Sequence, residues 1–191
     1  MRWLVGIMMS GLVVLSAAAE EKTPQNLVQN ADFSVKDPKN AGQPQFWLNQ
    51  VRVDQNGNKP DVQFSVIPSG EGEGNAVRIA APPPGKAGKT AALYVQTIKI
   101  KPDTNYYVSC YRKVKAGWAP VFFDLRDKDK KFVSVFGLDQ TENNGRDRFN
   151  LCEKSFRTGP DIHYGQVMLT VQNLGSGEAE FYKPTLIELP E

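Results

Sequence analysis

Turn-forming residues interrupt the sequence so often that a long helix has no room to form. Asn56-Gly57-Asn58, Pro82–Gly85 and Asn143–Gly145 are examples, and the stretches between such breakers are short and rich in β-branched and aromatic residues. After residue 25, no window sustains the i, i+3, i+4, i+7 apolar spacing of an amphipathic helix for three turns. Many short strands separated by turns are typical of an all-β sandwich, jelly roll or barrel. The predicted strands are Asn26–Phe33, Phe46–Val53, Val62–Ile67, Ala76–Ala80, Ala91–Ile100, Asn105–Val114, Ala119–Leu125, Phe132–Phe136, Arg148–Phe156, Gln166–Gln172 and Glu178–Leu189.

The first nineteen residues are predicted to be a secretory signal peptide. Arg2 gives a short basic start, residues 3–15 are almost entirely apolar, and Ser16–Ala19 supplies small residues at the −3 and −1 positions of a cleavage point. The polar residues 20–25 are predicted to be a disordered lead-in, and residues 26–191 a single domain. No Cys follows the small residues, so the bacterial lipid-anchor pattern is missing. We therefore expect a secreted or periplasmic protein.

The charge balance excludes one large class of partner. Removing nineteen residues from 191 leaves 172, and because Arg2 is removed with them, 22 basic side chains face 21 acidic ones, a net charge of +1. Nucleic-acid-binding proteins instead concentrate Lys and Arg against phosphates, so we expect no nucleic-acid partner. After the leader, no segment approaches the roughly eighteen consecutive apolar residues of a membrane span. No membrane span is predicted.

Five segments have recognisable spacings in a recognisable order. They are Asn26–Phe33 at the start, Phe46-Trp47 after Pro44, Tyr94–Tyr106, Phe149-x-x-Cys152-x-x-x-Phe156, and Glu180–Leu186 near the end. Together they resemble the ordered motifs of jelly-roll carbohydrate-binding modules, the group that includes families 4, 9, 16 and 22, over nearly all of the chain after the leader. The resemblance implies a two-sheet antiparallel β-sandwich with a galactose-binding-like jelly-roll fold, a face that binds glycans and no catalytic machinery.

The resemblance also bears on a structural calcium, which modules of this group often hold between carboxylates of the opening and closing strands. Ca²⁺ takes about six to eight oxygen ligands, some of them anionic. In this sequence Ser34 replaces the opening acid, and Tyr182 and Lys183 replace the closing acidic pair. Asp32 and Glu180 are the nearby carboxylates that could still supply ligands. Because the amino group of Lys183 disfavours a cation, no metal or other cofactor is expected.

Aromatic and long polar side chains are the candidate glycan contacts, since they match the apolar faces and the hydroxyls of sugars. Alternation along the strand predicted over residues 105–114 points Tyr106, Val108 and Cys110 toward the core and Tyr107, Tyr111 and Lys113 toward the opposite face. The second set is predicted to contact a glycan. A protein interface and ordinary cross-strand packing are the alternatives.

Three further candidates lie outside that strand. Trp118, in a loop-edge setting before Pro120, is predicted either to stack on a ligand or to close the edge of the sandwich. Asn49 and Arg52 are candidate polar contacts, although a solvated strand face explains them equally well. Trp47 itself is expected in the core.

The residues that could bind a metal, catalyse a reaction or form a disulfide are interpreted from their sequence context. Asp124–Lys131 mixes acids with Lys and Arg, which favours a charged hairpin turn over a metal loop. Ser/His/Asp and Cys/His catalysis depend on His163, the single histidine, which lies in a predicted loop. No catalytic residue is predicted. Cys110 and Cys152 are even in number in an exported chain, and both are predicted to face inward, so a disulfide between them is favoured. Two buried free thiols are the alternative.

The sequence thus predicts a secreted, non-catalytic module that recognises a neutral polysaccharide or oligosaccharide through an aromatic-bearing sheet face. An interaction or structural module that uses the same face on a protein of the cell envelope is the alternative, because such binding modules usually serve a catalytic domain in the same chain and no such domain is visible. A small hydrolase on the same fold has only the abundance of carboxylates in its favour.

Overall fold

The computed structural model describes residues 24–52, 61–81, 90–173 and 177–190. The predicted signal peptide and most of the predicted lead-in lie outside these residues. Within them, no helix is long and apolar enough to cross a membrane. The strands are β1 (Lys36–Asp37), β2 (Asn40–Pro44), β3 (Leu48–Arg52), β4 (Gln63–Pro68), β5 (Asn75–Ala81), β6 (Thr90–Lys99), β7 (Asn105–Ala116), β8 (Val121–Arg126), β9 (Phe132–Gly137), β10 (Asp139–Gln140), β11 (Asn150–Arg157), β12 (Tyr164–Asn173) and β13 (Gly177–Glu188).

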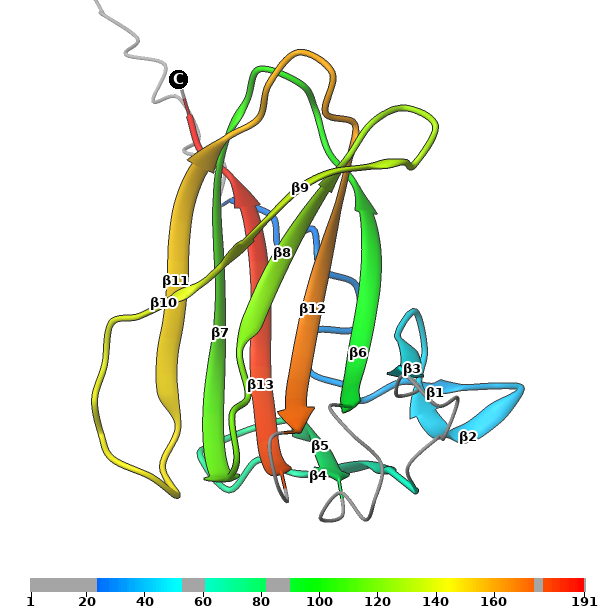
Figure 1. Cartoon of the computed structure of the whole chain (residues 1–191), viewed down its shortest axis with the longest axis vertical. Helices are drawn as coiled ribbons and strands as arrows, with labels where there is room; N and C mark the ends of the chain where they lie inside the picture. Colours follow the sequence, from blue (N-terminus) through cyan, green and yellow to red (C-terminus); the bar gives the residue numbers. More distant parts are fainter. Residues whose placement is uncertain (1–23, 53–60, 82–89, 174–176, 191) are drawn as a thin grey trace, which may run out of the picture.

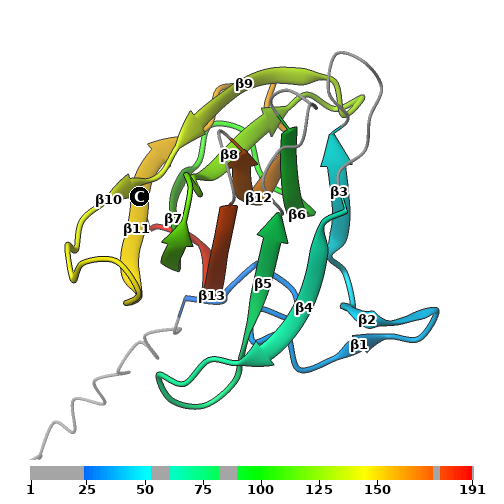
Figure 2. The same ribbon diagram turned by 60° about the horizontal axis from the view of Figure 1, so that its bottom comes forward.

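The strands form two antiparallel sheets that pack against each other (Figure 1 and Figure 2). The six-stranded sheet has the order β10-β11-β7-β13-β5-β4, the five-stranded sheet has the order β3-β6-β12-β8-β9, and β1 and β2 form a separate hairpin. Neighbours such as β7 with β13 and β6 with β12 are far apart in the chain, because the chain crosses repeatedly between the sheets. The predicted all-β, two-sheet jelly-roll sandwich is confirmed.

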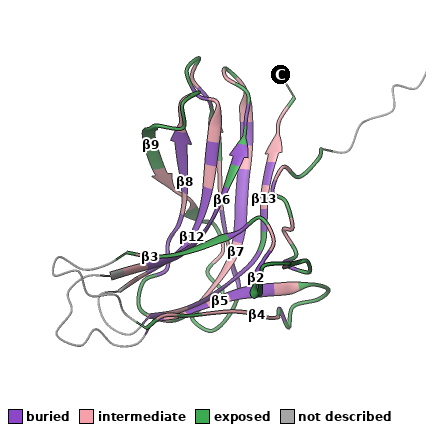
Figure 3. Ribbon diagram, turned by 90° about the vertical axis from the view of Figure 1, so that its right-hand side faces the viewer, coloured by how far each residue is buried: buried purple, intermediate pink, exposed green. Residues whose placement is uncertain are grey.

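The core lies between the two sheets, where the buried residues of the strands face each other (Figure 3). In β7, Tyr106, Val108 and Cys110 are fully buried, whereas Tyr107 and Tyr111 are only partly buried. This is the alternation that the sequence predicts, because successive side chains of a strand point to opposite faces. The strand therefore carries core residues and outer-face residues in turn.

The segment predicted as a first strand, Asn26–Phe33, is instead a series of turns. Asn30 and Phe33 have φ values of 49° and 54°, and these left-handed conformations break a pleated strand. The Asn26 side chain holds the segment to the six-stranded sheet, because its Oδ1 accepts the backbone N–H of Leu186 at 3.0 Å. A side chain that bonds the backbone in this way competes with a regular ladder, which explains why the prediction is wrong here.

Trp47 is in the core, as predicted. It is fully buried and packs on Phe33 at 5.3 Å between ring centroids. The preceding residue, Phe46, takes a φ of 70° and is exposed. The left-handed turn at Phe46 thus separates the buried ring from the exposed one.

The prediction that Cys110 and Cys152 form a disulfide is wrong. Cys110 on β7 and Cys152 on β11 are direct cross-strand partners, but both are free, buried thiols. Each sulfur lies near a backbone carbonyl instead: Cys110 Sγ is 3.3 Å from the oxygen of Tyr111, and Cys152 Sγ is 4.0 Å from the oxygen of Asn150. A bridge needs the two sulfurs about 2 Å apart. Burial raises the pKa of both thiols, so they pack as small apolar groups.

Candidate functional site

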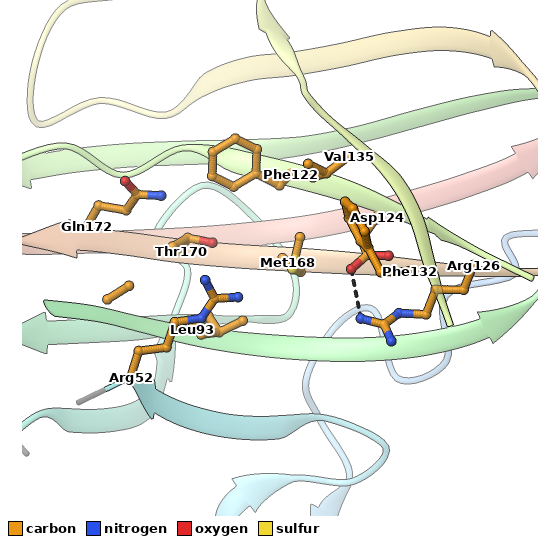
Figure 4. Close-up of a pocket in the computed structure, with 11 residues that line it drawn as sticks. Arg52, Leu93, Phe122, Asp124, Arg126, Phe132, Val135, Met168, Thr170 and Gln172 are labelled. Carbon is orange, nitrogen blue, oxygen red and sulfur yellow. Dashed lines mark hydrogen bonds and ion pairs between the residues drawn. The ribbon is translucent and has the colours of Figure 1, made fainter. Parts of the chain in front are cut away.

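A groove crosses the outer face of the five-stranded sheet, on the side turned away from the core (Figure 4). Its volume is about 380 Å³, and every strand of the sheet contributes to its lining: Arg52, Ala91, Leu93, Phe122, Asp124, Arg126, Phe132, Val135, Met168, Thr170 and Gln172. The register explains why they gather. Leu93 is paired with Thr170, and Met168 with Phe122, and residues directly opposite each other in a sheet share a face.

The floor of the groove is apolar. Leu93, Val95 and Met168 form a buried cluster, and the partly buried Phe122 packs against it. These side chains lie on the outer face of the sheet and not in the core between the sheets, and they are buried because they pack against one another. An apolar floor with few polar groups is typical of a binding site, because it excludes water from the surface that a ligand meets.

Exposed apolar side chains stand at both edges of this face. Phe132 and Val135 of β9 are 59% and 47% exposed and line the groove. At the other edge, Leu48 of β3 is paired with Val95 of the apolar cluster and is 59% exposed. Large apolar side chains left in solvent around an apolar floor indicate a surface that another molecule covers.

One charged pair lies in the groove. Asp124 Oδ2 accepts a hydrogen bond from Arg126 Nη2 at 2.9 Å, and Arg126 Nη1 donates to the carbonyl of Lys130 at 2.9 Å (Figure 4 shows the pair). The other carboxylate oxygen, Asp124 Oδ1, and Arg126 Nε are buried without a partner among the described residues. A buried polar atom without a partner is costly. These two atoms therefore keep unused hydrogen-bonding capacity next to the groove.

Two of the predicted contacts lie at this groove. Arg52 lines it, and Trp118 forms an isolated β-bridge with Gln172 of the lining, whose N–H donates to the Trp118 carbonyl at 2.8 Å. Trp118 is 50% exposed. Asn49 does not lie there: it is paired with the core residue Tyr94, so it belongs to the opposite side of β3 from Arg52.

Tyr107 and Lys113 lie on the outer face of the six-stranded sheet, where each has a partner. The Tyr107 hydroxyl donates to a carboxylate oxygen of Glu153. Burial raises the pKa of Tyr107, and this hydrogen bond raises it further. Lys113 Nζ lies 3.3 Å from Glu180 Oε2. The structure thus separates these two predicted contacts from the groove.

Tyr111 shares that outer face. Its ring packs on Tyr182 at 6.2 Å between centroids, and Tyr182 packs on Phe149 at 5.7 Å. The three rings line a more polar hollow of about 300 Å³, together with Glu71, Glu142, Asn144 and Lys183. Tyr111 is therefore half-buried in an aromatic cluster, and its role as a glycan contact stays a prediction.

The carboxylates named for a calcium site do not fit one. Glu180 is already paired, with Lys115 Nζ 2.5 Å from Oε1 and Lys113 Nζ 3.3 Å from Oε2. Asp32 Oδ1 accepts both the backbone N–H and the hydroxyl of Ser34. In the part of the chain that the structure describes, no three His, Cys, Asp or Glu side chains gather as metal ligands do.

The prediction from the sequence did not assign Asp124 and Arg126 to a candidate site. It placed both in the charged turn Asp124–Lys131, and a turn is indeed present, closed by Asp127 Oδ1, which accepts two backbone N–H groups at 2.9 Å. Asp124 and Arg126, however, precede the turn and belong to β8. The period-two spacing of Phe122, Asp124 and Arg126 is the signal that places all three on one face.

Known proteins resemble the chain in structure but not in sequence. No protein-family model matches it, and no curated protein matches it in sequence. The enzymatically active domain of tailspike protein 4 of bacteriophage CBA120 superposes with a TM-score of 0.64 and 13% identity, over 86% of this chain and 21% of the tailspike chain. The chain thus spans about a fifth of that protein.

Two carbohydrate-binding modules are similar over almost their whole length. TmCBM61, solved with β-1,4-galactotriose, has a TM-score of 0.53 and 13% identity, over 86% of this chain and 99% of that one. The CBM22-1 xylan-binding domain of Paenibacillus barcinonensis Xyn10C has a TM-score of 0.52 and 9% identity, over 78% of this chain and 90% of that one. At these identities the likeness shows the fold, which is the jelly roll of carbohydrate-binding modules.

Proposed function

We propose that the chain is a non-catalytic carbohydrate-binding module that holds a neutral glycan in the groove of the five-stranded sheet. The carrying observation is that an apolar floor, exposed apolar edges and unpartnered polar atoms meet in one groove. A pyranose ring has an apolar face and a rim of hydroxyls, so it needs both kinds of surface at once. The jelly-roll fold shared with modules whose names state galactotriose and xylan as ligands supports the same class.

The ring of Phe132 and the floor around Met168 match the apolar face of a sugar. Aromatic rings provide a large apolar area in a defined geometry. Asp124, Arg126 and the Gln172 amide, which line the groove, offer acceptors and donors for hydroxyls. The charge of Asp124 is matched by Arg126 at 2.9 Å, so this carboxylate does not require a cationic ligand.

The carboxylates support binding without catalysis. Glycoside hydrolysis generally uses two carboxyl groups that flank the scissile bond. Among the described residues that line the groove, Asp124 is the one carboxylate, and it is ion-paired. We also propose that the protein is secreted or periplasmic, a proposal that rests on the leader-like residues 1–19 of the sequence.

Affinity electrophoresis tests the proposal, with neutral polysaccharides cast in native gels. Galactan and xylan come first, because similar folds carry those names, followed by mannan and β-glucan. Retention by at least one polysaccharide is expected, followed by calorimetry with its oligosaccharides. Phe132→Ala should weaken binding about tenfold, the equivalent of about 1.4 kcal/mol, without unfolding the protein, because the ring is largely exposed.

Tyr107→Phe is the matched control on the other sheet. It removes the hydroxyl that bonds Glu153 and should leave retention unchanged. Lack of retention by every polysaccharide at millimolar sensitivity would contradict the proposal. A stoichiometric protein partner that co-purifies without any sugar binding would favour the envelope interaction module instead. If Tyr111→Ala abolishes binding and Phe132→Ala does not, the glycan lies on the six-stranded sheet.

A further inference from the structure

A third pocket lies beside the loop that joins β10 to β11, drawn in yellow in Figure 1. Its volume is about 260 Å³, and its lining comes from β7, β10, the loop and β11: Arg112, Val114, Gln140, Asn143, Gly145, Arg146 and Asn150. Arg112 shares the inward side of β7 with Cys110, yet it is not fully buried. The pocket therefore lies at the margin of the core, away from the lining of the groove.

The lining of this pocket is positively charged. Arg112 and Arg146 contribute two guanidinium groups, and no carboxylate lines the pocket. Neither arginine forms an ion pair with any of the described residues. Glu142 of the same loop is engaged elsewhere, because its Oε2 accepts the side-chain amide of Asn144 and the N–H of Leu151 at 3.3 Å each.

The guanidinium of Arg112 is held in place by neutral acceptors alone. Its Nη1 donates to the carbonyl of Ala119 at 3.0 Å, and its Nη2 donates to the side-chain oxygen of Gln140. Its Nε is buried without a partner among the described residues. A partly buried cation with no anion pays a desolvation penalty that its hydrogen bonds to neutral oxygens offset only in part. An oxyanion would supply the missing charge and accept the remaining N–H groups.

The loop around the pocket is fixed rather than loose. Asn150 is buried, its Oδ1 accepts the N–H of Asn144 at 2.6 Å, and its Nδ2 donates to the carbonyls of Gly145 and Arg148 at 3.1 and 2.9 Å. These three bonds set the path of the chain that carries Asn143 and Arg146. The backbone that carries these donors is thus positioned before any ligand arrives, which lowers the entropic cost of binding.

We propose that this pocket binds a small oxyanion, a sulfate or a carboxylate, with Arg112 as its main ligand and with Arg146 and the Asn143 amide at its rim. Two sources supply this chemistry: a free inorganic anion, or an acidic substituent of a sugar. The site is independent of the neutral-glycan groove, because the two sets of lining residues share no member.

Titration of the ¹⁵N-labelled full chain tests the proposal. Sodium sulfate and sodium glucuronate are added in separate series, with ionic strength held constant by sodium chloride. Saturable shifts are expected for the backbone amides of residues 140–150 and for the Nε–H signal of Arg112. Arg112→Gln should weaken binding about tenfold or more, the loss expected for a charge-assisted hydrogen bond.

Arg157→Gln is the matched control. Arg157 is exposed on β11, outside the pocket, and its substitution should leave both titrations unchanged. Phe132→Ala, which weakens glycan retention, should leave them unchanged too, so a failure of this site and a failure of the groove are distinguishable. If Arg112→Gln does not fold, Arg146→Gln, at an exposed position, should still weaken the binding.

The two probes also identify the source. Sulfate binding without glucuronate binding would indicate a free inorganic anion, and glucuronate binding without sulfate binding would indicate an acidic sugar. Absence of saturable shifts with either probe would overturn the proposal. Equal affinities of Arg112→Gln and the unmodified protein would overturn it as well.

Discussion

The two sheets of the sandwich present different outer faces to solvent. On the six-stranded sheet, charged side chains pair with one another: Arg78 Nε lies 2.8 Å from Glu178 Oε1, and Lys115 Nζ lies 3.1 Å from the same oxygen and 2.5 Å from Glu180 Oε1. On the five-stranded sheet, apolar side chains gather and Asp124 Oδ1 has no partner among the described residues. A face whose polar groups bond each other stabilises the fold. A face that leaves apolar side chains exposed and a polar atom without a partner is the candidate for ligand binding.

The register builds the charged ladder of the six-stranded sheet. Glu180 on the central strand β13 is opposite Arg78 on β5 and opposite Lys113 on β7. Opposite charges placed across neighbouring strands attract each other. The ladder therefore crosses three strands and covers the face that the aromatic residues of β7 share.

Glu180→Gln should give the largest effect: it should lower the stability of the protein and leave glycan retention unchanged. Glu180 is buried, and its loss leaves Lys113 and Lys115 without their closest anion. Breaking a buried pair costs several kcal/mol, and because both lysines are partly exposed we expect a loss of about 2 kcal/mol. Urea denaturation measures it, and glycan retention should not change. A loss below about 0.5 kcal/mol, within the range of ordinary surface substitutions, would show that the ladder is not structural.

Asp124→Asn should lower both the stability of the protein and its glycan affinity, because this residue lies in the groove and is ion-paired. Arg126 would lose its carboxylate partner, and the free energy of unfolding should fall by about 1 kcal/mol, the upper range for a partly exposed pair. Glycan affinity should fall about tenfold, equivalent to about 1.4 kcal/mol. Calorimetry and urea denaturation of the same variant measure the two effects.

The same chemical change in the neighbouring turn is the control for that variant. Asp127→Asn keeps an oxygen that can accept the two N–H groups of the turn, and it lies outside the groove lining. It should leave glycan affinity unchanged. Equal losses of affinity in both variants would mean that the carboxylate of Asp124 acts through the protein's overall charge and not by contact.

Protonation of Glu178, a carboxylate of the charged ladder, should give the smallest effect. The hydrogen bond from Arg78 is the main cause that lowers the pKa of Glu178, and Lys115 adds to it. A carboxylate whose pKa is depressed by folding stabilises the protein above its unfolded pKa of about 4.3, and this contribution is lost as the pH falls through the folded value. Because all three side chains are partly exposed, the loss should stay below about 1 kcal/mol.

A comparison with Glu178→Gln isolates that contribution. The variant cannot titrate at this position, so its stability should fall less steeply below about pH 4.3 than that of the unmodified protein. Thermal unfolding between pH 6 and pH 3 measures both slopes. Parallel slopes would show that Glu178 has the same pKa in the folded and unfolded chains.

Most of the fold could be predicted because its signals are local. Breakers and period-two alternation mark β6, β7 and β12 to within a few residues, and they place Tyr106 and Val108 in the core. The strand predicted for the opening segment is wrong for an equally local reason. The Asn26 side chain accepts a backbone N–H, and Asn30 and Phe33 adopt left-handed conformations. Apolar alternation alone does not report such side-chain-to-backbone bonds.

The site was less predictable because its state depends on residues from other strands. Alternation placed Tyr107 on the outer face. Its hydroxyl, however, donates a hydrogen bond to Glu153, which lies 46 residues further along the chain. Whether an outward side chain is free is therefore a property of the sheet and not of the strand. Arg52 and Trp118 were expected as contacts and lie at the groove, whereas Asp124 was assigned to a turn because charged residues follow it.

The alternation of β8 has a consequence for how such a module can diversify. Phe123 belongs to the core, and its neighbours Phe122 and Asp124 belong to the groove. Every second residue of β8 can thus change the lining of the groove while the residues between them keep the core intact, so a different groove needs no new scaffold. A shift of one residue in the pairing of β8 would bury the carboxylate of Asp124 and expose the ring of Phe123. Such a shift would therefore disrupt the core and the groove together.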